Sequence, residues 1–71
     1  MKISVIVKPL GNWGNVKVYK CDLVYETNEH FLLLRDGDAN PANSTLSTLI
    51  ANDMLIAIFP RKKVGLEINK I

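Results

Sequence analysis

Two groups of residues in this 71-residue chain have types and spacing that could support chemistry. The first is Cys21 with His30, the only cysteine and the only histidine, which lie on either side of a predicted turn at 26–29. If the turn centres on Thr27 and Asn28, the two side chains share one face but lie four residues apart. That is roughly 13 Å at ~3.3 Å per residue, whereas proton transfer from the thiol needs about 3 Å. We therefore expect no catalytic dyad, and we interpret Cys21 as a small core residue.

The second group is Asp36-Gly37-Asp38-Ala39-Asn40, which has the acidic opening of a calcium-binding loop. Pro41 stands where that motif needs glycine, and Ser47 stands where it needs a bidentate glutamate. A solvated turn is the better interpretation. One cysteine and one histidine are also too few for a zinc site. We expect no metal, no cofactor and no enzymatic activity.

Most apolar stretches alternate with period two, which is typical of β-strands. Strands are predicted at Lys2–Lys8, Val16–Thr27, His30–Arg35 and Met54–Phe59, with a short last strand around Leu66 and Ile68.

The second predicted strand changes its inward-facing parity along its length. The inward residues Val16 and Val18 occupy even positions, whereas the later inward residues occupy odd ones, namely Tyr19, Cys21, Leu23 and Tyr25. Such a switch needs a bulge or bend near positions 18–20, by which one long strand can join two sheets.

The segment Leu46–Ala51 is ambiguous. Ser44 could cap a helix with Leu46, Leu49 and Ile50 on one face. The threonine-rich composition instead favours a strand, and we expect a strand while keeping the short helix as the alternative.

The predicted fold is all-β, possibly with one short helix, in one domain covering 1–71. Five to six antiparallel strands, one of them long and bent, resemble in architecture a small SH3-like or Sm-like barrel. No sequence motif of a particular family supports more than this architectural resemblance. The expected core consists of Val5, Val18, Leu23, Tyr25, Leu32, Leu34, Ile56 and Ile58.

Charge is segregated along the chain although the net charge is only +2. Residues 1–20 hold four lysines and no acid, residues 21–53 hold six acids and one arginine, and residues 54–71 are again basic. Arg61-Lys62-Lys63 could contact phosphates, or it could be a solvated edge that blocks aggregation.

Two further features suggest a binding surface. Trp13 stands between Gly11 and Gly14, so it could contact a ligand or fold back as a lid over the core. Val24, Phe31 and Leu33 fall on the outward parity of the central hairpin, where we expect an exposed apolar interface.

The sequence therefore favours a non-enzymatic interaction module, a regulatory or adaptor protein that binds another protein and self-associates, most simply as a two-fold dimer. The expected contacts are Trp13, Val24, Phe31, Leu33, Arg61, Lys62 and Lys63. The alternative is a small nucleic-acid-binding barrel that uses its basic termini and Trp13. No stretch approaches the ~20 apolar residues of a membrane span, and a lone cysteine suits a reducing compartment, so we expect a cytoplasmic protein.

Overall fold

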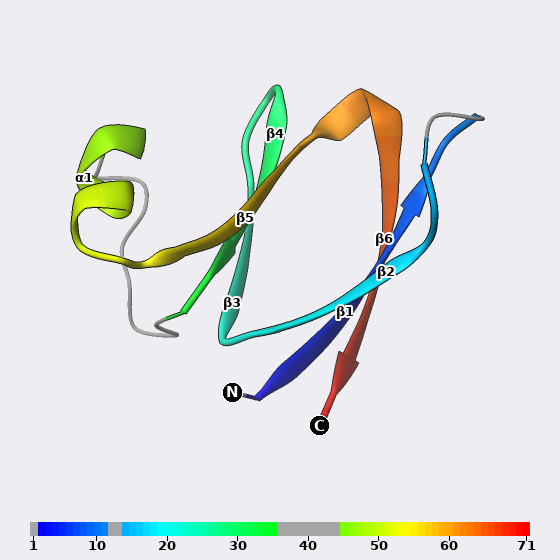
Figure 1. The fold of residues 1–71 in the computed structure, drawn as a ribbon, viewed down its shortest axis with the longest axis horizontal. Coiled ribbons are helices and arrows are strands. Elements are labelled where there is room, and N and C mark those ends of the chain that lie inside the picture. Colours follow the sequence, from blue (N-terminus) through cyan, green and yellow to red (C-terminus); the bar gives the residue numbers. More distant parts are fainter. Residues whose placement is uncertain (1, 12–13, 36–44) are drawn as a thin grey trace.

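The computed structural model describes residues 2–11, 14–35 and 45–71. These ranges contain six strands, one α-helix and one 3-10 turn (Figure 1). The elements are β1 (Ile3–Pro9), β2 (Lys17–Cys21), β3 (Leu23–Glu26), β4 (His30–Leu34), α1 (Leu46–Ala51), β5 (Leu55–Pro60), η2 (Arg61–Lys63) and β6 (Val64–Lys70). Among the described helices, none is long and apolar enough to cross a membrane.

The strands form two antiparallel sheets of three strands each. Sheet A has the order β2-β1-β6, and sheet B has the order β3-β4-β5. The chain passes between the sheets twice, through a bend at Asp22 between β2 and β3 and through η2 between β5 and β6 (Figure 1). The predicted β fold with one long bent strand is therefore confirmed, whereas the sheets do not close into a barrel.

The main core lies between the two sheets. Its buried residues come from both of them, and they are Val5, Val7, Cys21, Leu33 and Val64. Tyr19 and Phe59 close one side of this core, with ring centroids 5.4 Å apart in an edge-to-face arrangement.

A second core lies on the other face of sheet B, under α1. Leu32 and Leu34 of β4 are buried there against Leu49 of α1, with Tyr25 and Leu55 partly buried around them. The layers of the molecule are therefore α1, sheet B and sheet A, in the order in which Figure 1 shows them from left to right. Sheet B is consequently apolar on both of its faces.

The segment that we expected to be a strand is helix α1. Thr45, and not Ser44, is its N-cap: the Thr45 hydroxyl accepts a hydrogen bond from the Thr48 backbone N–H at 3.2 Å. The Asn52 backbone N–H donates to the Thr48 carbonyl at 3.0 Å at the other end. Strand propensity depends on tertiary context, and here the cap together with the burial of Leu49 favours the helix.

The predicted faces of the central hairpin are reversed in the structure. The chain bends at Asp22 and not at positions 18–20, so the inward parity changes after Cys21. A shift of one position moves every following side chain to the opposite face. As a result Val24, Phe31 and Leu33 belong to the core between the sheets, and Leu33 has no exposed surface at all.

The predicted core was therefore right for some residues and wrong for others. Val5, Leu32 and Leu34 are buried. Partly buried residues, each packed against one of the two cores, are Leu23, Tyr25 and Ile56. The prediction that Val18 and Ile58 lie in the core is wrong, because these residues are 63% and 36% exposed. The predicted strand Met54–Phe59 corresponds to β5, which is an edge strand of sheet B.

Candidate interaction surface

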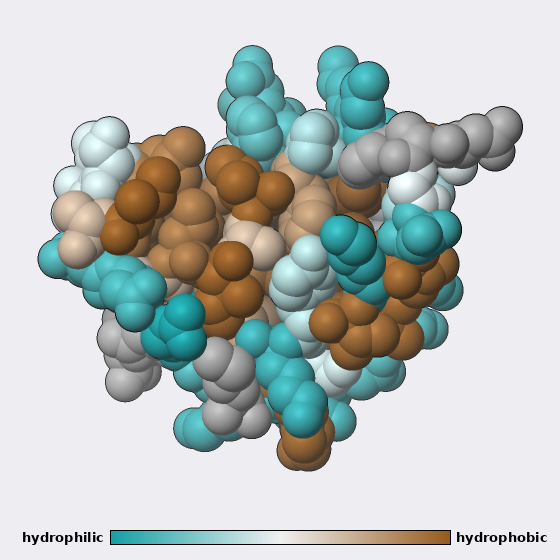
Figure 2. All heavy atoms as spheres, in the orientation of Figure 1, coloured by the Kyte–Doolittle hydropathy of each residue, from teal (hydrophilic) through white to brown (hydrophobic). Residues whose placement is uncertain are grey.

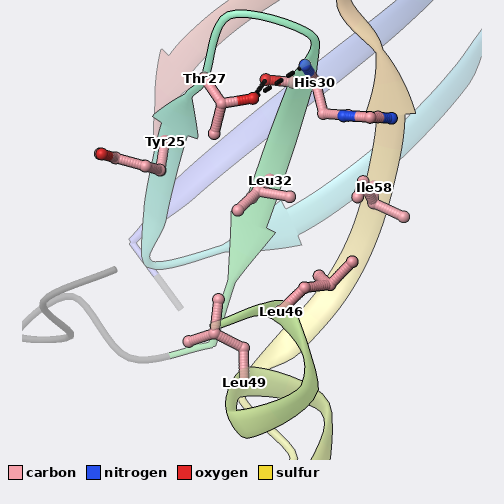
Figure 3. A pocket seen from close by; sticks show the side chains of 7 residues that line it. All are labelled: Tyr25, Thr27, His30, Leu32, Leu46, Leu49 and Ile58. Carbon is pink, nitrogen blue, oxygen red and sulfur yellow. Dashed lines mark hydrogen bonds between the residues drawn. The ribbon is translucent and has the colours of Figure 1, made fainter. Parts of the chain in front are cut away.

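A groove opens on the outer face of sheet B, beside α1, and we call it the outer groove. Its volume is about 180 Å³, and its lining residues are Tyr25, Thr27, His30, Leu32, Leu46, Leu49 and Ile58. Figure 3 shows that these side chains come from β3, β4, β5, α1 and the turn between β3 and β4. Five of the seven are apolar or aromatic, so the groove suits an apolar group of a partner.

One end of the outer groove is fixed by hydrogen bonds of Thr27. Its hydroxyl accepts from the backbone N–H of His30 at 2.9 Å and donates to the carbonyl of His30 at 3.1 Å (Figure 3). It also accepts from the Glu29 N–H at 3.3 Å. These bonds satisfy the backbone of the tight turn and place His30 at the end of the groove.

Apolar side chains around the outer groove remain exposed to solvent. Leu46 and Ile50 of α1 are 44% and 60% exposed, and Ile58 of β5 is also exposed. Figure 2 shows hydrophobic residues gathered over α1 and β5, with hydrophilic residues above the β3–β4 turn and η2. A contiguous apolar surface with a polar rim is typical of an interaction site.

A second depression, the basic cleft, lies next to the outer groove. It has a volume of about 480 Å³, and its lining residues are Asn28, Glu29, His30, Pro60, Lys62 and Lys63. His30 lines both depressions, so they meet at this residue. A cleft that carries two lysines thus shares one wall residue with the apolar groove.

The sequence-predicted basic run Arg61, Lys62 and Lys63 forms η2 and is exposed throughout. Acidic residues from the middle of the chain partly neutralise it. The Arg61 Nε lies 3.2 Å from a carboxylate oxygen of Glu26, and Glu29 lies in the cleft itself. The basic run therefore lies beside acidic residues from the middle of the chain.

The structure separates the two residues that could have formed a nucleophile pair. Cys21 is buried between the sheets, close to the β4 end at Leu34, whereas His30 lies at the other end of β4 on the outer groove. Burial raises the pKa of the Cys21 thiol above its ordinary value. The described ranges also contain no group of three or more His, Cys, Asp or Glu residues that could hold a metal ion.

Two sequence predictions fall on residues outside the described ranges. One is Trp13, as ligand contact or as lid, and the other is the turn Asp36-Gly37-Asp38-Ala39-Asn40. Val24, Phe31 and Leu33 all face the core between the sheets and not the outer face of the hairpin, with Leu33 buried and Val24 and Phe31 partly buried.

Sequence reasoning missed most of the outer groove. Tyr25, Leu32 and Ile58 were placed on the inward face because the hairpin parity was reversed. The signal for Leu46 was present in the helical alternative for Leu46–Ala51, in which Leu46, Leu49 and Ile50 share one face.

Comparison with known proteins adds no family to this description. No protein-family model matches the chain, and no curated protein or solved structure matches it significantly.

Proposed function

We propose that this chain is a non-enzymatic interaction module, a regulatory or adaptor protein of the cytoplasm that binds another protein and self-associates. The observation that carries the proposal is the outer groove with its exposed apolar rim at Leu46, Ile50 and Ile58. A chain of 71 residues has few apolar side chains to spare. Leaving this set outside both cores is costly unless a partner covers it.

The chemistry of the surface suggests what the partner presents. The apolar outer groove and the basic cleft meet at His30, and Lys62 and Lys63 line the cleft beyond it. The complementary ligand is a protein segment with one or two large apolar side chains followed by acidic side chains. Burial of the apolar groups would supply affinity, while the charges would orient the segment and raise its association rate.

A protein ligand is favoured over nucleic acid by the acidic residues around η2. Glu26 pairs with Arg61, and Glu29 shares the cleft with the lysines. Both carboxylates would repel a phosphate backbone. Nucleic-acid binding through the basic termini and Trp13 is therefore the second candidate function, and the test below can detect it.

The proposal also includes a fold relationship. The long bent strand shared by two sheets, and a 3-10 turn leading to a last strand beside the first, support an open variant of the SH3-like or Sm-like architecture. Because such folds occur in proteins of many unrelated functions, the fold relationship alone does not indicate a function. Cytoplasmic location is part of the proposal because a single buried thiol suits a reducing compartment.

The test is a selection of ligands from a random peptide library displayed on phage, using the complete chain as bait. We expect selected peptides to share large apolar residues followed by Asp or Glu. A selected peptide, labelled and titrated by fluorescence anisotropy, should bind the Leu46→Asp variant at least about tenfold more weakly, as for a central contact residue. Val18→Asp is the matched control, because Val18 is an exposed apolar residue of sheet A that lines neither depression.

Two results would contradict the proposal. One is an equal loss of peptide binding in the Leu46→Asp and Val18→Asp variants. The other is tight binding of a single-stranded DNA or RNA oligomer whose log affinity falls steeply with log salt concentration, which would establish the nucleic-acid reading instead.

A further inference from the structure

Strand β5 is an edge strand that carries no charge. Its sequence is Leu-Ile-Ala-Ile-Phe-Pro, and no strand of the described residues pairs with its outer edge. The other edge strands all carry charged residues: Lys17 and Lys20 in β2, Glu26 in β3, and Glu67 and Lys70 in β6. Charged residues protect open edges against pairing with other chains, and β5 lacks this protection.

The hydrogen-bond pattern shows which backbone groups of β5 face the open edge. The Arg61 N–H donates to the Glu29 carbonyl at 2.8 Å, so residue 61 points toward β4. The backbone groups of an antiparallel strand alternate in direction. Phe59 therefore also points toward β4, and Ile58, opposite Leu32, directs its N–H and C=O to the open edge. Pro60 has the same direction but no N–H, so it limits the pairing surface at that end.

Opposite charges flank this uncharged strand. Asp53 stands just before β5, with its exposed carboxylate 3.9 Å from Arg35 of the same chain, whereas Arg61, Lys62 and Lys63 follow β5 directly. When two copies of β5 lie antiparallel, the acidic end of one strand meets the basic end of the other. With Ile58 opposite Ile58 of the second copy, Ala57 lies opposite Phe59 and Ile56 opposite Pro60, all within the extended strand. The uncharged part of the strand is thus complementary to itself.

We propose that β5 pairs antiparallel with β5 of a second copy of this chain, with Ile58 on the two-fold axis. The inference deepens the self-association within the proposed function and rests on it. Two reciprocal hydrogen bonds join the Ile58 backbones, and the two copies of sheet B become one sheet of six strands. In Figure 1, β5 passes in front of β3 and β4, and Figure 2 shows hydrophobic residues over β5 in the same view.

The pairing also explains why Ile58 is exposed in the single chain. Its side chain lies on the outer face of sheet B and lines the outer groove (Figure 3). Directly opposed residues in an antiparallel pair have Cβ atoms about 4.5–5.5 Å apart. The two Ile58 side chains would cover each other and connect the outer grooves of the two copies.

The first test measures the mass of the complete chain by sedimentation equilibrium over a range of concentrations. We expect a monomer–dimer equilibrium. Ile58→Lys should raise the dimer dissociation constant at least about tenfold, because two like charges would face each other at the axis. Val18→Lys is the matched control, an equal charge on an exposed apolar residue of edge strand β2, and should leave the equilibrium unchanged.

The second test reads the register. Ile58→Cys, oxidised with glutathione disulfide, should form a covalent dimer, because paired Cα atoms about 5.5 Å apart suit a disulfide. Val18→Cys should not.

A strictly monomeric mass would overturn both the self-association and this interface, while peptide binding in the outer groove would be unaffected. A dimer that persists in Ile58→Lys, or that weakens equally in Val18→Lys, would overturn the β5 interface alone. Ile58 lines the outer groove and also lies at the proposed axis, so the peptide titration is made at a protein concentration at which sedimentation shows only monomer, and the two failures are then distinguishable.

Discussion

Replacing Leu33 with alanine tests the arrangement of the two sheets most directly. Leu33 of sheet B has no exposed surface and lies in one cluster with buried residues of sheet A, including Val5 and Val64. The substitution removes three carbon groups from this core, which corresponds to about 2.4 kcal/mol of transfer free energy at about 0.8 kcal/mol each. A residual cavity adds about 24 cal/mol per Å³. We therefore expect the free energy of unfolding to fall by about 3–4 kcal/mol.

This loss is large for so small a chain. At about 0.05–0.15 kcal/mol per residue, a chain of 71 residues has a free energy of unfolding of about 4–10 kcal/mol. Leu33→Ala should therefore move the urea midpoint far toward zero while the m-value stays unchanged. Unfolding followed by far-ultraviolet circular dichroism measures both quantities.

Val18→Ala is the control for Leu33→Ala, because Val18 also lies in a strand but is largely exposed. Its expected effect is below about 0.5 kcal/mol. If Leu33→Ala were as stable as Val18→Ala, Leu33 would lie on the surface, and the assignment of the hairpin faces would be refuted.

Three smaller predictions concern the helix cap, the buried thiol and one ion pair. Thr45→Ala should lower the free energy of unfolding by about 1 kcal/mol, whereas Thr45→Ser should retain the cap and the stability. Burial raises the pKa of the Cys21 thiol. The contribution of the neutral thiol to the free energy of unfolding is therefore fully present below the ordinary pKa of about 8.5, and it is lost as the pH rises through the folded-state pKa. Unfolding at a series of alkaline pH values should therefore show a decline that Cys21→Ala makes shallower. Glu26→Gln should change stability by less than about 1 kcal/mol, since its pair with Arg61 is half-exposed; a larger loss would mean that the pair is structural.

The strands could be predicted from the sequence because alternation of apolar residues marks extended backbone wherever it occurs. The strand predicted at Lys2–Lys8 corresponds to β1, with Val5 in the core as expected. The long bent strand is β2 and β3, which join the two sheets. These features depend on local pattern, which one chain carries in full.

The faces of the hairpin could not be predicted, because both of them are apolar. Leu32 and Leu33 are neighbours on opposite faces of β4 and both are buried, one under α1 and one under sheet A. A period-two pattern selects a face only when the other face is polar. The position of the bend at Asp22 then decides the outcome, and bends leave a weak signal in the sequence.

The edge position of β5 could not be predicted either, because this strand is also apolar on both faces. A fully apolar strand is typical of the centre of a sheet, yet β5 pairs only with β4 among the described strands. The hairpin turn is also displaced by one residue. Val24 pairs with Leu33, so the turn centres on Asn28 and Glu29 and not on Thr27 and Asn28.

The dimensions of α1 explain why the outer groove exists at all. Six residues of α-helix span about 9 Å, whereas the six residues of β5 span about 20 Å. A helix of this length can cover only about half of the apolar outer face of sheet B, and Leu49 marks the covered part. The less covered part, around His30 and Ile58, borders the outer groove. A longer helix would bury this surface within the chain, so the short one makes the apolar face of sheet B accessible to a partner.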